Sequence, residues 1–98
     1  MSKKATARAS ARHILVKTRE ECDKIKAEIA VGASFAEMAR KHSQCPSGKK
    51  GGELGEFGPG QMVPEFDTVV FHEEVGKVHG PIRTQFGYHL VEVTRRTP

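Results

Sequence analysis

Two histidines stand inside apolar runs of this sequence, where ionisable side chains are uncommon. His13 lies within residues 12–16 and His89 within residues 88–91. A polar group buried in a sheet needs a hydrogen-bond partner, and neighbouring strands would let the two imidazoles satisfy each other. The pair is therefore either a satisfied feature of the core or part of a catalytic site, and the sequence pattern leaves both interpretations open.

A cysteine and several large apolar side chains stand close to a glycine-rich segment. Cys45 comes just before it, and six of the ten glycines lie between positions 48 and 60. A thiol in such a loop is a candidate nucleophile. The large apolar side chains near the ends of the predicted loops are Leu54, Met62, Phe66 and Phe86. They form either part of the core or the wall of a pocket.

Two other candidate motifs, a phosphate-binding loop and a metal site, lack the residue spacing that their chemistry requires. Residues 47–50 (SGKK) lack the upstream glycine and the following Ser or Thr of a phosphate-binding loop. His13, Cys45 and His89 are far apart in sequence, and no CxxC or HxxxH pair accompanies them. We expect neither a metal ion nor a cofactor.

The first half of the chain predicts one strand followed by two helices. Residues 11–16 have the β-branched, apolar character of a strand. Thr18 and Ser34 each precede a glutamate by three residues, the spacing of a capping box at a helix start. The apolar positions of the two helices are Cys22, Ile25 and Ile29, then Phe35, Met38 and Ala39, and Gly32 separates them.

The second half predicts a third helix and two closing strands. Leu54 and Phe57 indicate a very short strand inside the glycine-rich segment. Pro64 suits the first turn of a helix whose apolar face holds Met62, Phe66, Val69 and Val70. Residues 81–84 and 88–93 read as strands around a turn at 85–87. The pattern predicts an α+β fold, a small antiparallel sheet covered by helices.

The positive charge of the chain is confined to its beginning. Of the net charge of +4 in 98 residues, all is carried by Lys3, Lys4, Arg8 and Arg12, because residues 13–98 hold twelve basic and twelve acidic side chains. We expect residues 1–10 to be a flexible basic tail and residues 11–98 to be the folded domain. A neutral body argues against a nucleic-acid-binding face, although the tail could contact polyanions weakly.

Length and apolar content limit the class of protein further. The apolar runs are too short for a membrane helix. We expect no secretory signal, because no apolar stretch follows the first charged residues. Two cysteines are too few for a disulfide-built scaffold. We expect one domain, a monomer, in the reducing cytoplasm and without membrane contact.

The segments singled out so far, taken in order, resemble the parvulin family of peptidyl-prolyl cis/trans isomerases, and closely its minimal single-domain bacterial members. The matching segments are residues 13–16, 35–39, 43–47, 51–57, 60–66 and 80–89. The resemblance as a whole covers essentially residues 11–95, in the family's order. The resemblance implies a four-stranded antiparallel sheet surrounded by about four helices, in the order βα3βαβ2. The additional helix is a short turn near residues 46–50, which the apolar pattern alone does not predict.

The resemblance also implies a site. Met62, Phe66 and Phe86 would form a proline pocket with Leu54 at its edge, and Gln61 would help to hold the substrate backbone. His13, Cys45, Thr84 and His89 would form the catalytic polar network behind the reacting bond. Family members can carry Asp in place of Cys45, which favours a network role for this thiol over a covalent one.

The function that the resemblance implies is acceleration of rotation about X–Pro bonds in folding polypeptides, by non-covalent stabilisation of the twisted amide and without a cofactor. The alternative is a non-catalytic, chaperone-like module that binds proline-containing segments. Phosphate-directed members carry a long basic loop after the first strand, whereas Lys17 and Arg19 here flank the start of a helix. We therefore expect unphosphorylated substrates, with an apolar or basic residue before the proline.

Overall fold

The computed structural model describes residues 7–97, which form a four-stranded sheet, three α-helices and one short 3-10 helix. The elements run in the order β1 (Arg8–Val16), α1 (Arg19–Ala30), α2 (Phe35–His42), the 3-10 helix η2 (Pro46–Lys50), β2 (Glu53–Phe57), α3 (Pro64–His72), β3 (Val78–Thr84) and β4 (Gly87–Thr97). The predicted α+β class, the order of the elements and the short helix at 46–50 are confirmed.

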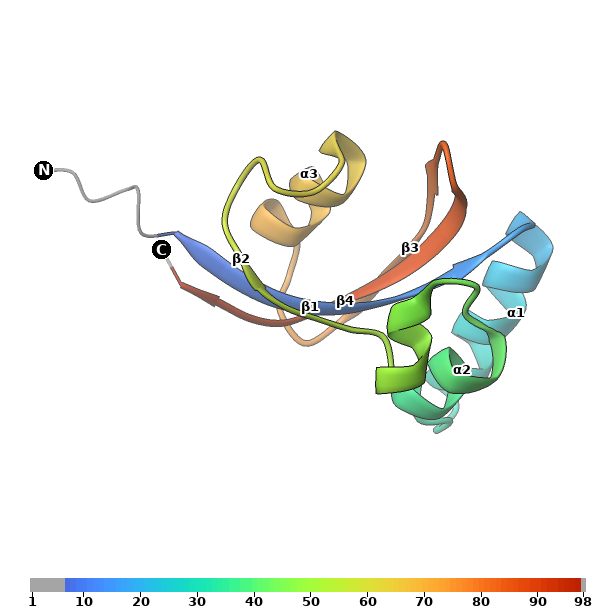
Figure 1. The fold of residues 1–98 in the computed structure, drawn as a ribbon. Helices are drawn as coiled ribbons and strands as arrows, with labels where there is room; N and C mark the ends of the chain where they lie inside the picture. The colour runs from blue at the N-terminus through green and yellow to red at the C-terminus, as the bar shows by residue number, and fades with distance from the viewer. Residues whose placement is uncertain (1–6, 98) are drawn as a thin grey trace, which may run out of the picture.

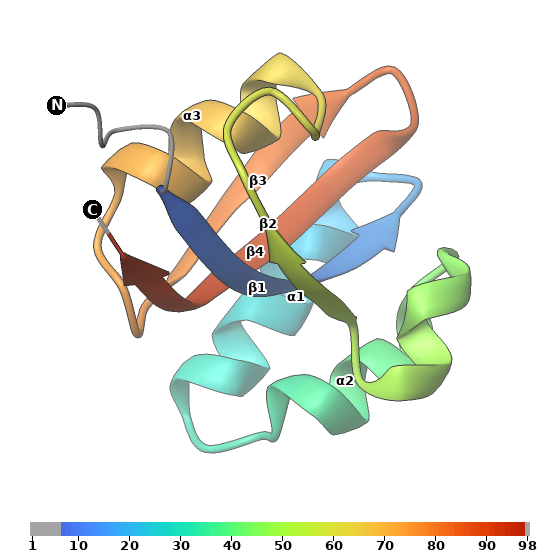
Figure 2. The ribbon, with the colours of Figure 1, turned by 60° about the vertical axis from the view of Figure 1, so that its left-hand side comes forward.

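The strands lie in the order β2-β1-β4-β3, and every neighbouring pair is antiparallel. Helix α3 covers one face of the sheet, and α1 and α2 cover the other, as Figures 1 and 2 show. The two central strands carry the paired histidines: His13 of β1 lies opposite Val91 of β4, and His89 of β4 lies opposite Leu15 of β1. Strands that are distant in sequence thus place the two imidazoles side by side.

Alternation along the central strands produces two apolar clusters, one on each face. The cluster beneath α1 and α2 contains Ile14, Val16, Cys22, Ile25, Phe35, Met38, Ala39 and Leu90. The cluster beneath α3 contains Ala9, Ala11, Phe57, Phe66, Val70, Val91 and Val93. In β4, Leu90 and Val91 therefore serve opposite faces, and His89 shares the face of Val91 and Val93, as the alternation predicts.

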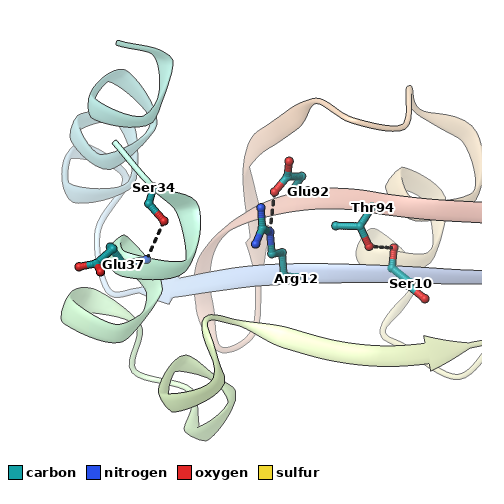
Figure 3. Close-up of polar contacts among 6 residues, drawn as sticks. All are labelled: Ser10, Arg12, Ser34, Glu37, Glu92 and Thr94. Atoms are coloured by element: carbon teal, nitrogen blue, oxygen red, sulfur yellow. Dashed lines mark hydrogen bonds and ion pairs between the residues drawn. The ribbon is translucent and has the colours of Figure 1, made fainter. Parts of the chain in front are cut away.

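Both predicted helix caps are present. The hydroxyl of Thr18 accepts a hydrogen bond from the backbone N–H of Glu21 at 3.1 Å. The hydroxyl of Ser34 accepts from the backbone N–H of Glu37 at 3.3 Å (Figure 3). Such capping bonds stabilise a helix by about 1 kcal/mol each.

On the face of the sheet that α1 and α2 cover, Arg12 of β1 donates to the carboxylate of Glu92 on β4 at 2.6 Å (Figure 3).

The central strands are longer than predicted. Strand β1 begins at Arg8 rather than at residue 11, and β4 continues to Thr97 rather than ending at 93. The added residues are polar or small and give no apolar pattern, but their backbones pair, from Arg8 opposite Thr97 to Ser10 opposite Arg95. A bulge follows, where the hydroxyl of Thr94 donates to the carbonyl of Ser10 at 3.0 Å (Figure 3).

This longer strand corrects the predicted boundary of the basic tail. Residues 8–10 belong to the sheet, and the backbone pairing with β4 is the physical reason. Arg8 and Arg12 both lie in β1, so two of the four excess positive charges belong to the folded domain. The predicted flexibility of the remaining tail, including Lys3 and Lys4, concerns a part of the chain that lies mostly outside the described residues.

Two smaller differences concern the second half. Strand β3 begins at Val78, earlier than residue 81, and Met62 lies before α3 rather than on its apolar face. Pro64 at the first turn fixes where α3 starts, and this leaves Met62 in the preceding loop. None of the helices described is both long enough and apolar enough to cross a bilayer.

Candidate active site

An apolar pocket of about 370 Å³ opens on the α3 face of the sheet. Strand β1 supplies His13 and Leu15 to its wall, β4 supplies His89, and α3 supplies Phe66. The remaining wall comes from η2 and the segment before it, from β2, from the segment before α3 and from the β3–β4 turn. These contribute Gln44, Cys45, Pro46, Leu54, Met62, Val63 and Phe86. Residues 7–97 contribute no acidic side chain, lysine or arginine to this wall.

Phe66 joins the apolar pocket to the histidines. Its side chain is 3% exposed, and its ring meets the imidazoles of His13 and His89 edge to face, with centroids 5.3 and 5.1 Å apart. The opposite wall is different, because the Phe86 ring on the β3–β4 turn is 62% exposed. The pocket therefore has a rigid floor and an exposed aromatic rim, a shape suited to a small apolar ring.

The two histidines form the centre of a buried hydrogen-bonded chain. Their Nδ1 atoms are 3.1 Å apart. On one side, His13 Nε2 lies 3.1 Å from the hydroxyl of Ser47 on η2. On the other, His89 Nε2 lies 2.8 Å from the hydroxyl of Thr84, which also accepts from the backbone N–H of Phe86 at 3.1 Å. The chain therefore runs beneath the pocket, from η2 to the rim that carries Phe86.

This geometry limits the number of protons on the pair. One hydrogen between the two Nδ1 atoms makes a bond, whereas two N–H groups facing each other would repel. When both rings are neutral, the two tautomers are coupled: whichever ring donates through Nδ1 leaves its own Nε2 as an acceptor. The chain can hold one additional proton, but not two.

Burial sets the charge of both rings. Desolvation and, to a lesser extent, the neighbouring His89 lower the pKa of His13 from 6.5 to about 4. Desolvation also lowers the pKa of His89, although the carboxylate of Glu65 opposes this shift. The pair is therefore neutral at pH 7, and neither ring is poised to donate a proton to a substrate.

We expect the free energy of unfolding to decrease as the pH is lowered from about 6.5 to about 4. In this window His13 binds a proton in the unfolded chain but not in the folded one, so acid favours unfolding. His13 accounts for a loss of about 3 kcal/mol over the window. Urea unfolding from pH 7.5 to 4 should show this slope, and His13→Gln should reduce it. The exposed His72 is the control, and a slope that His72→Gln reduces as much as His13→Gln would contradict the assignment.

A glycine allows this arrangement to form. The N–H of His13 donates to the carbonyl of Gly52 at 2.9 Å, and Gly52 has a φ of +88°. A Cβ at this position would overlap the carbonyl oxygen of His13. The glycine-rich segment thus lets the backbone that follows η2 lie directly against β1, and this places Ser47 within reach of the imidazole.

The structure brings most of the predicted site residues together, with two differences. Cys45 lies at the pocket wall, but no hydrogen bond among residues 7–97 links its thiol to the histidine chain. Gln61 does not line the pocket, and its side-chain oxygen accepts from the N–H of Gly58 at 2.6 Å, which holds the loop closed. Thr84 belongs to the histidine chain, since its hydroxyl lies 2.8 Å from His89 Nε2.

Several residues that line the pocket or join the histidine chain had no predicted site role. The most informative is Ser47, which ends the histidine chain. Leu15, Gln44, Pro46 and Val63 also line the pocket. Leu15 could have been found, because it follows His13 by two residues and strand alternation puts both on one face. Ser47 carried no such signal, since its partner is 34 positions away.

Comparisons with known proteins agree with this geometry. The family model described as "Rotamase: PPIC-type PPIASE domain" matches residues 3–95. A curated relative, "Foldase protein PrsA" of Geobacillus sp. (strain WCH70), is 45% identical over 85 residues, which are 86% of this chain and 31% of that protein. The chain thus spans about a third of the length of this relative and of a second foldase PrsA, from Geobacillus kaustophilus (strain HTA426).

Among the solved structures that share the fold, two illustrate the range of chain lengths. A peptidylprolyl isomerase (PrsA) of Bacillus anthracis matches with a TM-score of 0.90 and 38% identity, over 94% of this chain and 43% of that one. NmPin, described as the parvulin of Nitrosopumilus maritimus, matches with a TM-score of 0.81 and 35% identity, over 90% of this chain and 96% of that one. The second likeness covers nearly the whole of both chains.

Proposed function

This chain belongs to the rotamase family of PpiC-type peptidyl-prolyl isomerase domains, and we propose that it accelerates cis/trans rotation about X–Pro bonds in unphosphorylated polypeptides and so assists their folding. The observation that carries the proposal is the apolar pocket whose floor, Phe66, rests on two buried, neutral histidines. A proline ring fits such a pocket, and the reacting amide would then lie beside the polar chain beneath it.

The mechanism follows from the chemistry of the amide. Rotation must break the resonance of the C–N bond, which gives a barrier of about 18–20 kcal/mol. An apolar pocket holds the proline ring by Met62, Phe66 and Phe86 and excludes water from the amide. Catalysis then requires only that the twisted geometry be bound more tightly than the planar one. The histidine chain contributes by fixing the pocket floor and the local field, with no bond formed to the substrate.

We expect Cys45→Asp to keep a substantial part of the isomerase activity. In a non-covalent mechanism the residue at this position is a lining group, and a carboxylate can replace a thiol there. The measurement is a protease-coupled assay on an X–Pro tetrapeptide, with Cys45→Ser as the matched control of similar size. Activity at background in Cys45→Asp, with the fold intact, would instead indicate a thiolate that attacks the substrate.

The substrate class is tested by three peptides that differ only before proline. The wall described above has no basic side chain for a phosphate, and Lys17 and Arg19 flank the start of α1. The proposal therefore predicts faster turnover of peptides with Leu than with phosphoserine before the proline, with Glu as the comparison for charge. A preference for phosphoserine over both Leu and Glu would contradict it.

We also propose that the domain acts as a monomer in the reducing cytoplasm. The pocket wall is complete within one chain, and Cys22 and Cys45 are both free thiols, Cys22 being buried under the opposite face of the sheet. Light scattering that gives a mass near 10.8 kDa and recovery of the protein in the cytoplasmic fraction would support this. A stable dimer or an extracellular location would contradict it.

A further inference from the structure

A second, smaller cleft of about 200 Å³ adjoins the pocket. It lies between the start of α3 and the β3–β4 turn and is lined by Val63, Pro64, Glu65, Thr84 and Gln85. Val63 belongs to the walls of both hollows. On the turn, Phe86 lines the pocket and the neighbouring Gln85 lines the cleft. A polypeptide with its proline in the pocket would therefore extend an adjacent residue towards this cleft.

The charge of the two hollows is uneven. Among residues 7–97, no charged side chain lines the pocket, because its two histidines are neutral. Within the same residues, Glu65 is the single charged side chain that lines the cleft. Glu65 is exposed and forms no ion pair within the described part of the chain. Its carboxylate is also close enough to His89 to oppose the lowering of that pKa. Because the cleft and the pocket share Val63, this negative charge lies beside the pocket and is exposed to a bound polypeptide.

The position of Glu65 in the first turn of α3 has a simpler explanation, because acidic residues favour helix N-termini. Asp67, in the same turn, does serve the local structure: its carboxylate accepts from the N–H of Gly60 at 2.9 Å. No hydrogen bond in the described residues uses the Glu65 carboxylate in this way. The two acids of one helical turn therefore differ in what they bind, and only Glu65 faces the cleft.

We propose that Glu65 is a specificity-determining residue that receives the positive side chain of a lysine or arginine directly adjacent to the proline of the substrate. This inference rests on the proposed isomerase function and refines its substrate class. The attraction is that of an exposed ion pair, so it favours binding of basic substrates by about 2- to 5-fold. It weakens as salt is added.

The test uses peptides with Lys, Leu or Glu at the residue before proline, and a second series varied at the residue after it. In at least one series, the wild-type protein at low salt should show a kcat/KM about 2- to 5-fold higher for Lys than for Leu, expressed through KM rather than kcat. Glu65→Gln should remove this preference, and Glu65→Lys should reverse it towards the Glu peptide. Glu56→Gln, an exposed acid of β2 that lines neither hollow, should leave it unchanged.

An unchanged ratio of Lys to Glu peptides in Glu65→Lys, in both series, would overturn the inference. So would an equal loss of preference in Glu56→Gln, since this would show a long-range charge effect rather than a local contact. Turnover of the Leu peptide separates this inference from the function on which it rests. If the wild-type protein accelerates no peptide at all, the proposed isomerase function fails; if it turns over the Leu peptide but ignores charge, only the role of Glu65 fails.

Discussion

Replacing Phe66 with alanine should lower isomerase activity by roughly 100-fold, because the variant loses both the floor of the pocket and its contact with the proline ring. The same change removes a ring that is packed against both imidazoles and is 3% exposed. Such a substitution costs about 3–5 kcal/mol of folding free energy. A domain of this size has little more stability than that to lose.

Two further variants keep this prediction testable if Phe66→Ala fails to fold. Phe66→Leu retains most of the buried volume and should fold, but its branched side chain cannot replace the flat ring, so activity should still fall about 10-fold. Val70→Ala is the matched control, because Val70 is equally buried on α3, one turn further on, and lines no wall of the pocket. It should lower the urea midpoint and leave kcat/KM nearly unchanged. Wild-type activity in a folded Phe66→Leu protein would contradict the assignment of Phe66.

Replacing His89 with leucine should destabilise the domain by about 2–3 kcal/mol, because His13 Nδ1 and the Thr84 hydroxyl then lose a buried partner. Activity should fall together with stability, by roughly 10-fold, as the pocket floor loses its support. The double variant, with leucine at both His13 and His89, should cost less than the sum of the two single variants. Removing both partners leaves fewer unpaired polar groups than removing one.

Urea unfolding and peptide exchange on the two single variants and the double variant measure this coupling. Strict additivity would mean that the 3.1 Å contact between the two rings contributes nothing. A His89→Leu protein that unfolds at the wild-type urea concentration but has no activity would contradict the positioning role of His89. It would show that the imidazole acts on the substrate directly.

The regular parts of this fold were predictable because they depend on local chemistry. The Thr18 and Ser34 caps and the buried stripe of α2 follow from side-chain types at fixed spacing, and the structure has them as expected. The outer ends of β1 and β4 were not predictable. Arg8 and Arg95 carry no apolar pattern, and they are held in the sheet by backbone pairing with residues more than eighty positions away.

The site residues also fall into those that the sequence could indicate and those that it could not. The apolar pattern left open whether Leu54, Met62, Phe66 and Phe86 belong to the core or to a pocket. The family resemblance implied a pocket, and all four side chains line one in the structure. Ser47 and Glu65 could not be assigned roles from sequence. Their positions depend on how η2 meets β1 and how α3 meets the β3–β4 turn, which tertiary packing decides.

The most direct test of the account is two-dimensional NMR exchange spectroscopy on a Leu–Pro tetrapeptide, with and without a catalytic amount of the protein. Uncatalysed exchange takes tens of seconds or more. We expect cross-peaks between the cis and trans forms on a sub-second timescale with the wild-type protein, retained in Cys45→Asp and developing about 10-fold more slowly in Phe66→Leu at matched concentration. Peptide resonances that shift on binding while the exchange rate stays at its uncatalysed value would show a binding module, and would contradict the central claim that this pocket catalyses the rotation.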